Sequence, residues 1–305
     1  MSTICHPQPT CSSVSAARDA SRAPTGVSVA LSHQGVLDVR GTKGNDNVSV
    51  VKNGQMIDVH DGDKLLGSFA ADQVKQVRVN SGAGDDNVRV DVGVERQVRI
   101  NTGNGNDTVN LAHSQDALVK TGRGNDTVNV SDSDGARIQT AGGTDKVSLY
   151  NSNNCRVNTG NGDDQVNLFN SDGNTVRTGN GNDAVAAVNS DNNRIDTGNG
   201  NDDVSALKSH GNDISTGRGD DNVGLNGSFG NRVRTGLGRD RVGMNRSGGN
   251  DIDTGRGDDR VTLTNSSNNR VRTGPGNDRV TVRNTARFLR SRHCHWTPPV
   301  RLGCR

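Results

Sequence analysis

A repeat of 19 residues constrains this sequence more than any other feature. From Thr102 to about Asn284 the chain repeats one pattern ten times; two copies read TGNGDDQVNLFNSDGNTVR and TGRGDDRVTLTNSSNNRVR. The sixth-position aspartate recurs every 19 residues without insertion, at Asp107, Asp126, Asp145, Asp164, Asp183, Asp202, Asp221, Asp240, Asp259 and Asp278. A fixed period of this kind is typical of a solenoid, in which each repeat buries its apolar side chains against its neighbours.

The apolar positions within one repeat alternate, which predicts short strands with one buried side. The first strand supplies Val109, Val128, Val147, Val166, Val185, Val204, Val223, Val242, Val261 and Val280, then Leu111, Val130, Leu149, Leu168, Ala187, Ala206, Leu225, Met244 and Leu263. The second supplies Ile100, Val119, Ile138, Val157, Val176, Ile195, Ile214, Val233, Ile252 and Val271. Two strands and two polar turns per coil predict an all-β fold, a flattened parallel β-solenoid of 19-residue coils.

A column of asparagines accompanies the second strand. They stand two residues before the later second-strand aliphatics, at Asn174, Asn193, Asn212, Asn231, Asn250 and Asn269. Because side chains alternate along a strand, we expect them to point inward and to hydrogen-bond to one another along the axis, since buried amides need partners. Cys155 occupies the same column and is interpreted as a small buried residue.

The turn T-G-x-G-N-D suggests a cation site. Its two glycines permit positive φ and bring carbonyl oxygens together. Aspartates of successive coils would stack about 4.8 Å apart, where carboxylates repel by about 1 kcal/mol in water and by several at an effective dielectric near 20. Carboxylates and carbonyls without thiolate or imidazole favour Ca²⁺. The alternative is ordinary Gly-Asn-Asp turn chemistry without metal.

The predicted calcium ligands are the turn aspartates and glycines, with about one ion for each turn between coils. The aspartates are Asp46, Asp86 and the ten named above. The glycines are Gly103, Gly105, Gly122, Gly124, Gly160, Gly162, Gly179, Gly181, Gly198, Gly200, Gly217, Gly219, Gly236, Gly238, Gly255, Gly257, Gly274 and Gly276. The coil from Thr140 to Asp145 departs from the glycine pattern, so only Asp145 is included there.

The segment TGNGNDTVN, from Thr102 to Asn110, resembles the nonapeptide of haemolysin-type (RTX) calcium-binding repeats, with threonine replacing the first glycine. In that family neighbouring turns share Ca²⁺ between glycine carbonyls and aspartates, so the resemblance implies calcium along one edge of the solenoid. The 19-residue coil is also similar to that of the calcium-dependent bacterial ice-binding adhesin. That family's outward threonine is replaced here by residues such as Arg123, Leu237 and Pro275, so ice binding is not expected.

Four regions are expected along the chain. Residues 1–26 form a polar leader that is neither a signal peptide nor a membrane span and is expected to be disordered. Residues 27–80 form an N-terminal β cap with a first turn at Gly41–Asp46 and a hairpin, and residues 81–284 form the solenoid. Residues 285–305 form a basic tail, also expected to be disordered.

Outward basic residues on the second strand suggest a partner. They form two columns: Arg99, Arg137, Arg156, Arg194, Arg232 and Arg270, then Lys120, Arg177, Arg234 and Arg272. This arginine strip could bind a polyanion such as an acidic polysaccharide or lipopolysaccharide, or be a solvated face that balances the acidic turns. Only 2% of residues are aromatic, so no specific nucleic-acid binding is expected.

No histidine falls in a repeated column with a nucleophile or paired carboxylates, so we expect no enzyme. The sequence predicts a secreted bacterial calcium-binding protein, exported without a cleaved signal peptide, that acts as a structural or adhesive surface module. A polyanion-binding surface or effector protein and a calcium-dependent polysaccharide lyase are the alternatives. The oligomeric state is left open.

Overall fold

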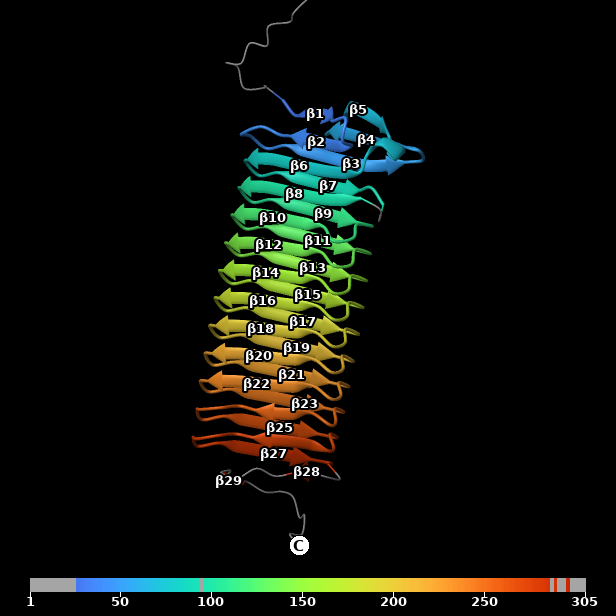
Figure 1. Ribbon diagram of the computed structural model, residues 1–305. Helices are drawn as coiled ribbons and strands as arrows, with labels where there is room; N and C mark the ends of the chain where they lie inside the picture. The colour runs from blue at the N-terminus through green and yellow to red at the C-terminus, as the bar shows by residue number, and fades with distance from the viewer. Residues whose placement is uncertain (1–25, 94–95, 286–287, 290–294, 297–305) are drawn as a thin grey trace, which may run out of the picture.

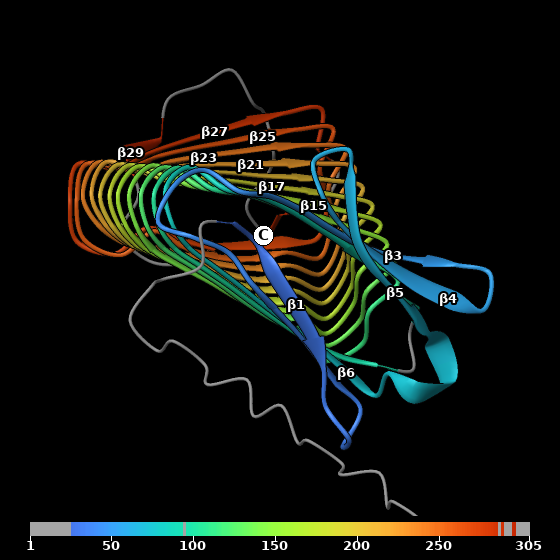
Figure 2. The same ribbon diagram turned by 90° about the horizontal axis from the view of Figure 1, so that it is seen from above.

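The computed structural model describes residues 26–93, 96–285, 288–289 and 295–296. These residues form a parallel β-solenoid of about 11 turns with about 19 residues per turn, which confirms the predicted fold class (Figure 1). Two sheets face each other across the core, and successive coils superpose when the solenoid is seen along its axis (Figure 2). We call the 14-stranded sheet sheet A and the 15-stranded sheet sheet B.

Sheet A contains the second strand of each repeat. Its strands, in spatial order, are β1 (Ser28–Leu31), β2 (Val36–Arg40), β6 (Gln76–Ala83), β8 (Gln97–Asn104), β10 (Leu118–Arg123), β12 (Arg137–Gly142), β14 (Arg156–Asn161), β16 (Thr175–Asn180), β18 (Arg194–Asn199), β20 (Asp213–Arg218), β22 (Arg232–Leu237), β24 (Asp251–Asp253), β26 (Asn269–Arg272) and β28 (Phe288–Leu289). All neighbours pair in parallel except β1 with β2.

Sheet B contains the first strand of each repeat. From the N-terminal end its strands are β5 (Lys64–Ala70), β4 (Met56–Asp61), β3 (Asn47–Asn53), β7 (Asn87–Asp91), β9 (Thr108–Ala112), β11 (Thr127–Ser131), β13 (Lys146–Tyr150), β15 (Gln165–Phe169), β17 (Ala184–Val188), β19 (Asp203–Leu207), β21 (Asn222–Asn226), β23 (Arg241–Asn245), β25 (Arg260–Thr264), β27 (Arg279–Arg283) and β29 (His295–Trp296). One short 3-10 helix, η1 (Ala71–Gln73), links β5 to β6.

The strand register places equivalent residues of successive coils side by side. Val109 lies opposite Val128, and Ile138 opposite Val157. All three aliphatic rows predicted from the sequence are buried between the sheets, and the six asparagines and Cys155 are buried with them, as expected. Two further rows, of threonine and of serine, are also buried. The core is therefore built of columns that run along the solenoid axis.

Two turns close each coil. The aspartate turn, residues 102–107 and their equivalents, leads from sheet A to sheet B. The asparagine turn, residues 113–117 and their equivalents, leads back. The asparagine turn begins with a residue at φ near +50°, often asparagine as at Asn151 and Asn170, because asparagine tolerates the left-handed region better than most residues.

The N-terminal end of the solenoid is covered. β3, β4 and β5 form an antiparallel meander, and the expected turns at Asn53-Gly54 and Asp61-Gly62 connect them. Leu66 and Phe69 pack against the core, whereas Leu65 is 54% exposed. In Figure 2 the meander projects beyond the outline of the coils. Antiparallel strands at this end shield it from edge-to-edge pairing, as a cap would.

At the other end, β28 pairs with β26 and β29 pairs with β27, both in parallel. The rest of the basic tail, the leader before Gly26 and the cysteines Cys5, Cys11, Cys294 and Cys304 lie outside the described residues. Within the described ranges, no helix is long and apolar enough to cross a membrane.

We predict that the second glycine of the aspartate turn is required for coil stacking. A Cβ on Gly124, at φ +134°, would overlap the carbonyl oxygen of Gly105 in the preceding coil. Gly124→Ala should therefore destabilise the protein by at least about 1–3 kcal/mol, the cost of a strained backbone alone. Gly224→Ala is the matched control, because a Cβ there would meet no atom within 4 Å. Thermal unfolding followed by circular dichroism compares the two, and equal melting temperatures would contradict the prediction.

Candidate cation site along the aspartate turns

The aspartate turn brings one threonine, two glycines and one aspartate of each coil into line with those of the next coil. In coil 121–126, Thr121 and Asp126 are both buried, and Gly122 and Gly124 have φ of +99° and +134°. The glycines bend the chain sharply enough for the aspartate side chain to enter the turn. In this coil, strand β10 of sheet A ends at Arg123 and strand β11 of sheet B begins at Thr127. The site therefore lies at the edge where the chain passes from sheet A to sheet B.

The buried aspartates form a continuous ladder of hydrogen bonds. The backbone N–H of each aspartate donates to the carboxylate Oδ1 of the aspartate one coil later, as from Asp107 to Asp126 at 2.9 Å. The same bond recurs at 2.8–3.0 Å from Asp46 to Asp278. Each carboxylate therefore satisfies a buried peptide N–H that the turn leaves without a carbonyl partner.

The second oxygen, Oδ2, has less support. In four coils the threonine hydroxyl five residues earlier donates to it, as from Thr121 to Asp126 at 2.5 Å. That hydroxyl has one proton, and the carbonyl of the next threonine competes for it, as Thr121 O does for Thr102 at 3.4 Å. Oδ2 has no hydrogen bond of ordinary geometry at Asp86, Asp107, Asp145, Asp164, Asp183, Asp259 and Asp278. At the first six of these, the neighbouring hydroxyl of Ser81 or of the equivalent threonine still lowers the pKa of the carboxyl.

Glycine carbonyls form a second file of oxygens beside the carboxylates. Each second-glycine carbonyl oxygen lies against the position that a Cβ of the equivalent glycine one coil later would occupy, which is why a side chain has no room there. In the described part of the chain, no hydrogen bond ends on these carbonyls between Gly105 and Gly219. These glycines are partly buried, and with their carbonyls unpaired this edge has more oxygen acceptors than donors.

Burial raises the pKa of the turn aspartates, and neighbouring carboxylates add to the shift. The pKa reaches about 6 for Asp126, Asp164, Asp221 and Asp259, compared with the usual 3.8. The threonine hydroxyl and the ladder N–H act in the opposite direction but do not offset burial. The pKa is raised for the same leading reason at Asp86, Asp107, Asp145, Asp183, Asp202 and Asp240.

These donors fit a hard cation such as Ca²⁺. The position that a Cβ on Gly257 would occupy is in contact with the Gly238 carbonyl oxygen and lies 3.3 Å from Asp259 Oδ1. A carbonyl of one coil and a carboxylate of the next thus approach the same point. No three acidic, histidine or cysteine side chains gather anywhere in the described ranges. A cation here would therefore be held by one or two carboxylates together with backbone carbonyls, as Ca²⁺ commonly is.

The asparagine turn solves the same hydrogen-bonding problem without charge. From Cys155 to Asn269, the N–H of each residue in the buried column donates to the Oδ1 of the asparagine one coil later, as from Asn193 to Asn212 at 2.7 Å. Serine hydroxyls form a parallel column, as from Ser133 N–H to Ser152 Oγ at 3.1 Å. A neutral amide is therefore a sufficient acceptor for such a ladder, and the aspartates at the opposite edge need a separate explanation.

Two of the predicted turns differ from the rest. In coil 140–145, Ala141 adopts φ +80° in place of the first glycine, and Asp145 keeps its ladder bonds. In the first turn, both the backbone N–H and the hydroxyl of Thr42 bond to the Asp46 carboxylate. Coil 140–145 thus retains the shared geometry, whereas Asp46 has no unpaired oxygen.

The buried threonines and serines were not predicted as site or core residues. Thr102 stands two residues after the inward Ile100, so the alternation along the strand already indicated an inward side chain. The resemblance to the nonapeptide instead suggested a substituted glycine. The serines follow the residue of positive φ that begins the asparagine turn, where alternation no longer applies.

The arginine strip lies on the outer face of sheet A and is partly neutralised. Arg234 pairs with Asp213 at 3.0 Å, and Arg272 pairs with Asp251 and Asp253 at 3.2 Å. In the described ranges, Arg99, Arg137, Arg156 and Arg177 have no ion pair, and neither have Arg232 and Arg270. The aspartates that pair with the strip lie on β20 and β24 only.

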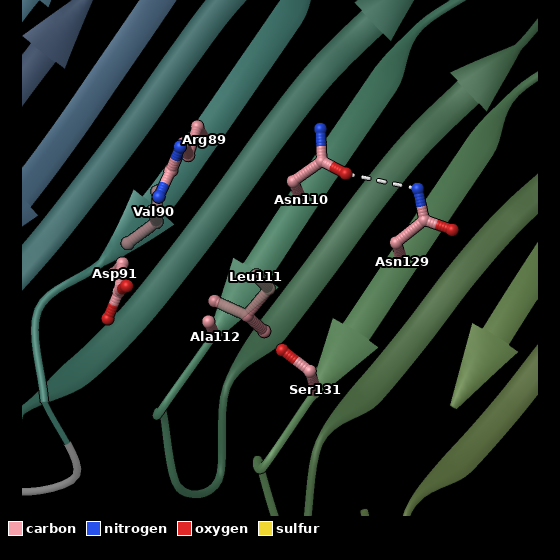
Figure 3. Close-up of a pocket in the computed structure, with 8 residues that line it drawn as sticks. All are labelled: Arg89, Val90, Asp91, Asn110, Leu111, Ala112, Asn129 and Ser131. Carbon is pink, nitrogen blue, oxygen red and sulfur yellow. Dashed lines mark hydrogen bonds between the residues drawn. The ribbon is translucent and has the colours of Figure 1, made fainter. Parts of the chain in front are cut away.

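A shallow pocket of about 310 Å³ opens on sheet B across β7, β9 and β11 (Figure 3). Arg89 and Asp91 come from β7, and Asn129 Nδ2 donates to Asn110 Oδ1 at 3.0 Å on its floor. None of the predicted calcium ligands lines it.

No family model and no curated protein matches this sequence. A solved structure, described as the crystal structure of the periplasmic alginate epimerase AlgG, matches with 10% identity and a TM-score of 0.28. The match covers 84% of this chain and 85% of that chain. A likeness this weak carries no argument about substrate or mechanism. The RTX assignment receives no confirmation from these comparisons.

The prediction that the chain is not an enzyme is corrected here. The matched structure is that of an enzyme, an epimerase, so a non-enzyme assignment is not supported. The absence of a repeated catalytic column had suggested that exclusion, but a catalytic site needs only one copy of its residues. The match assigns no reaction and no catalytic residue to this chain.

Without divalent cations, we predict that the solenoid becomes less stable as the pH rises. The pKa of Asp126, Asp164, Asp221 and Asp259 is about 6 in the folded chain and near 3.8 when exposed. The folded state therefore holds protons that the unfolded state releases, and this stabilisation is present below about pH 4 and lost through pH 6. In chelator, melting at pH 7.5 should occur about 10 °C lower than at pH 5, because 1 kcal/mol shifts such a domain by about 2–4 °C. A higher melting temperature at pH 7.5 would contradict the prediction.

Proposed function

We propose that the protein is a calcium-binding β-solenoid whose coils are tied together by Ca²⁺ along the aspartate turns. The observation that carries this proposal is the difference between the two edges. Both edges need an acceptor for a buried N–H, and the asparagine turn uses a neutral amide. The aspartate turn uses a carboxylate in every coil although burial disfavours its charge. A bound cation would compensate for that cost.

The ligands in this proposal are the carboxylate oxygens of the turn aspartates and the carbonyl oxygens of the turn glycines. The ion would neutralise the file of carboxylates and supply the missing partner of Oδ2 at residues such as Asp164 and Asp183. Calcium accepts six to eight oxygens in flexible geometry, whereas Mg²⁺ requires a small octahedral site and retains its waters. Selectivity for Ca²⁺ over Mg²⁺ is therefore part of the proposal.

At the level of biology, we propose a secreted structural or adhesive surface module. A stiff rod of about 11 coils presents long outward columns whose residues vary from coil to coil. Such columns can carry recognition chemistry without disturbing the core. Coupling stability to Ca²⁺ would leave the chain less stable where calcium is scarce and stabilise it after export.

We predict that Ca²⁺ binds and stabilises the protein at neutral pH. Titration with Ca²⁺ at pH 7.5 should raise the melting temperature, because a ligand that binds only the folded state stabilises it by about 2.7 kcal/mol at one hundred times its Kd. Mg²⁺ at the same concentration should have much less effect. Calorimetry counts the bound ions, and no heat of Ca²⁺ binding together with an unchanged melting temperature would overturn the proposal.

A pair of opposite substitutions tests the role of the charge. Asp202→Asn keeps an Oδ1 acceptor for the N–H of Asp183, which donates to it at 2.9 Å, and removes the charge. It should stabilise the protein in chelator and reduce the stabilisation by Ca²⁺. Asn193→Asp places a charge in the asparagine turn, away from the glycine carbonyls. It should destabilise the protein, and Ca²⁺ should not rescue it. Rescue of Asn193→Asp by Ca²⁺ would show that Ca²⁺ binding is not specific to the aspartate turns.

Polyanion binding by the arginine strip is a second candidate function. It is favoured by Arg137, Arg156 and Arg177 on β12, β14 and β16, which have no ion pair, whereas Arg194, Arg234 and Arg272 farther along sheet A pair with aspartates. Oriented basic side chains on successive strands attract polymers with regularly spaced negative charges, such as acidic polysaccharides.

We predict that the arginine strip binds polygalacturonate and that this binding depends on Arg137 and Arg156. The double substitution R137Q/R156Q should weaken binding at low salt by about tenfold. The matched control R234Q/R272Q removes the same charge from arginines that pair with aspartates, and should weaken it much less. Biolayer interferometry across a salt series measures both, and equal losses would argue against a localised site.

A further inference from the structure

An apolar patch stands out on the polar outer face of sheet B. One outward column carries large apolar residues on four successive strands, Tyr150, Phe169, Val188 and Leu207. Tyr150 is 51% exposed, and Phe169 and Leu207 are each 39% exposed. On β17 the other outward residues, Ala184 and Ala186, are apolar as well. We call these six residues the apolar patch.

The side chains of the apolar patch do not pack in the core of the described chain. The side chains point away from the core, which is filled by the alternate residues of the same strands, such as Val185 and Leu168. The corresponding column is polar or small on the flanking strands, with Ala112 and Ser131 before the patch and Asn226 and Asn245 after it. A contiguous exposed apolar surface bounded by polar residues is typical of an interaction site.

The charges at the ends of the patch indicate its partner. Lys146 begins β13, the first strand of the patch, and Asp203 begins β19, the last. Both are exposed and occupy the same outward column. The patch therefore has a positive end and a negative end, equally far from its centre between β15 and β17.

We propose that two copies of the chain form a two-fold symmetric dimer by stacking their sheet B faces at the apolar patch. The two-fold axis lies between the two stacked sheets, runs parallel to the strands, and passes between β15 and β17. The second copy therefore has its strands in the same direction as the first and its solenoid axis in the opposite direction. This places β13 of one copy against β19 of the other. Lys146 then faces Asp203 of the second copy, twice, and Tyr150 faces Leu207. Such self-complementary contacts are what an isologous interface requires.

The remaining pairs agree with this arrangement. Phe169 faces Val188 of the second copy, and Ser148 faces Ser205. Beyond the patch, β11 faces β21 and β9 faces β23, where small polar residues such as Asn129 and Gly224 meet and no like charges come together. The opposite alignment, with both solenoids running the same way, reverses the strands and would place Lys146 over Tyr150 and Asp203 over Leu207 of the second copy, so that neither charge finds a partner. Charge thus selects one orientation.

The size of the interface predicts a dimer of moderate affinity. Four strands of five residues cover about 17 Å by 19 Å at 3.3 Å per residue and 4.8 Å per strand, or about 320 Å² on each copy. Including the two flanking strands on each side roughly doubles that area. The total then lies near the lower limit of stable interfaces, about 1,200 Å². We therefore expect dissociation in the micromolar range.

Sedimentation equilibrium of the full chain tests the dimer. The 32.1 kDa chain should associate to twice that mass with a micromolar dissociation constant. The proposal does not rest on calcium binding, so the measurement is made in Ca²⁺ and in chelator wherever circular dichroism shows a folded chain. Phe169→Ser should weaken association at least tenfold, whereas Leu237→Ser, a change at another exposed apolar residue, should not. A folded chain that stays monomeric at 100 µM would overturn the proposal.

Charge reversal tests the two-fold arrangement itself. Lys146→Asp or Asp203→Lys alone should weaken the dimer about tenfold, because each creates two like-charge pairs. The combined variant K146D/D203K should restore the affinity, because the pairs re-form with their signs exchanged. Lys120→Asp on sheet A is the control for net charge. Failure of the combined variant to recover would refute the arrangement, even if a dimer exists.

A zero-length cross-link between Lys146 and Asp203 supplies independent evidence. Within one chain these residues are three coils apart, or about 14 Å, which is too far for direct amide formation. A carbodiimide should therefore join them only between copies, and mass spectrometry should find that peptide pair in the dimer band. Cross-linked dimers that lack this pair would place the interface elsewhere.

Discussion

The structure depends on one constraint, that polar backbone groups buried at the turns must find partners in the neighbouring coil. Strands satisfy their own N–H and carbonyl groups by parallel pairing, but the turns interrupt the ladder. At the aspartate turn a carboxylate one coil away accepts the N–H, as Asp126 does for Asp107, and at the asparagine turn an amide does so, as Asn212 does for Asn193. Both partners must stay level at the turns, so added residues are accommodated between the turns. The ladder continues across intervals of 40 residues, from Asp46 to Asp86, and of 21 residues, from Asp86 to Asp107.

The same constraint separates structural from functional chemistry. An amide and a carboxylate serve equally well as ladder acceptors, but only the carboxylate adds a charge whose burial raises its pKa. Oxygens without a hydrogen bond of ordinary geometry, on carboxylates such as Asp164 and on glycine carbonyls such as Gly181, recur from coil to coil at that edge. Proton and cation can both relieve this excess of acceptors, so stability, pH and divalent ions should be linked at the aspartate turns.

The outward-facing columns of residues contribute little to the stability of the fold. Their residues do not pack in the core, so they differ from coil to coil: arginine and aspartate on sheet A, and small, apolar or charged residues on sheet B. Salt bridges such as Arg234–Asp213 on exposed strands add at most about 1 kcal/mol to stability. The distribution of outward residues therefore says more about partners than about folding. A straight solenoid aligns them at a constant spacing, which favours repeated or self-complementary contacts.

Much of the fold of this protein follows from its sequence alone. Apolar side chains alternate along each strand, and the whole pattern repeats every 19 residues, which leaves few possible folds. That pattern predicted the solenoid, the three aliphatic rows, the inward asparagines and the buried Cys155. It could not determine which atoms pair at the turns, since the aspartate ladder arises from contacts between residues 19 positions apart in three dimensions. The resemblance to a glycine-rich nonapeptide also obscured the inward side chain of Thr102. Only the tertiary structure decided that Oδ1 is engaged while Oδ2 is often unpaired, and that four sheet B strands bring separate apolar residues into one patch, because stacking alone sets those distances.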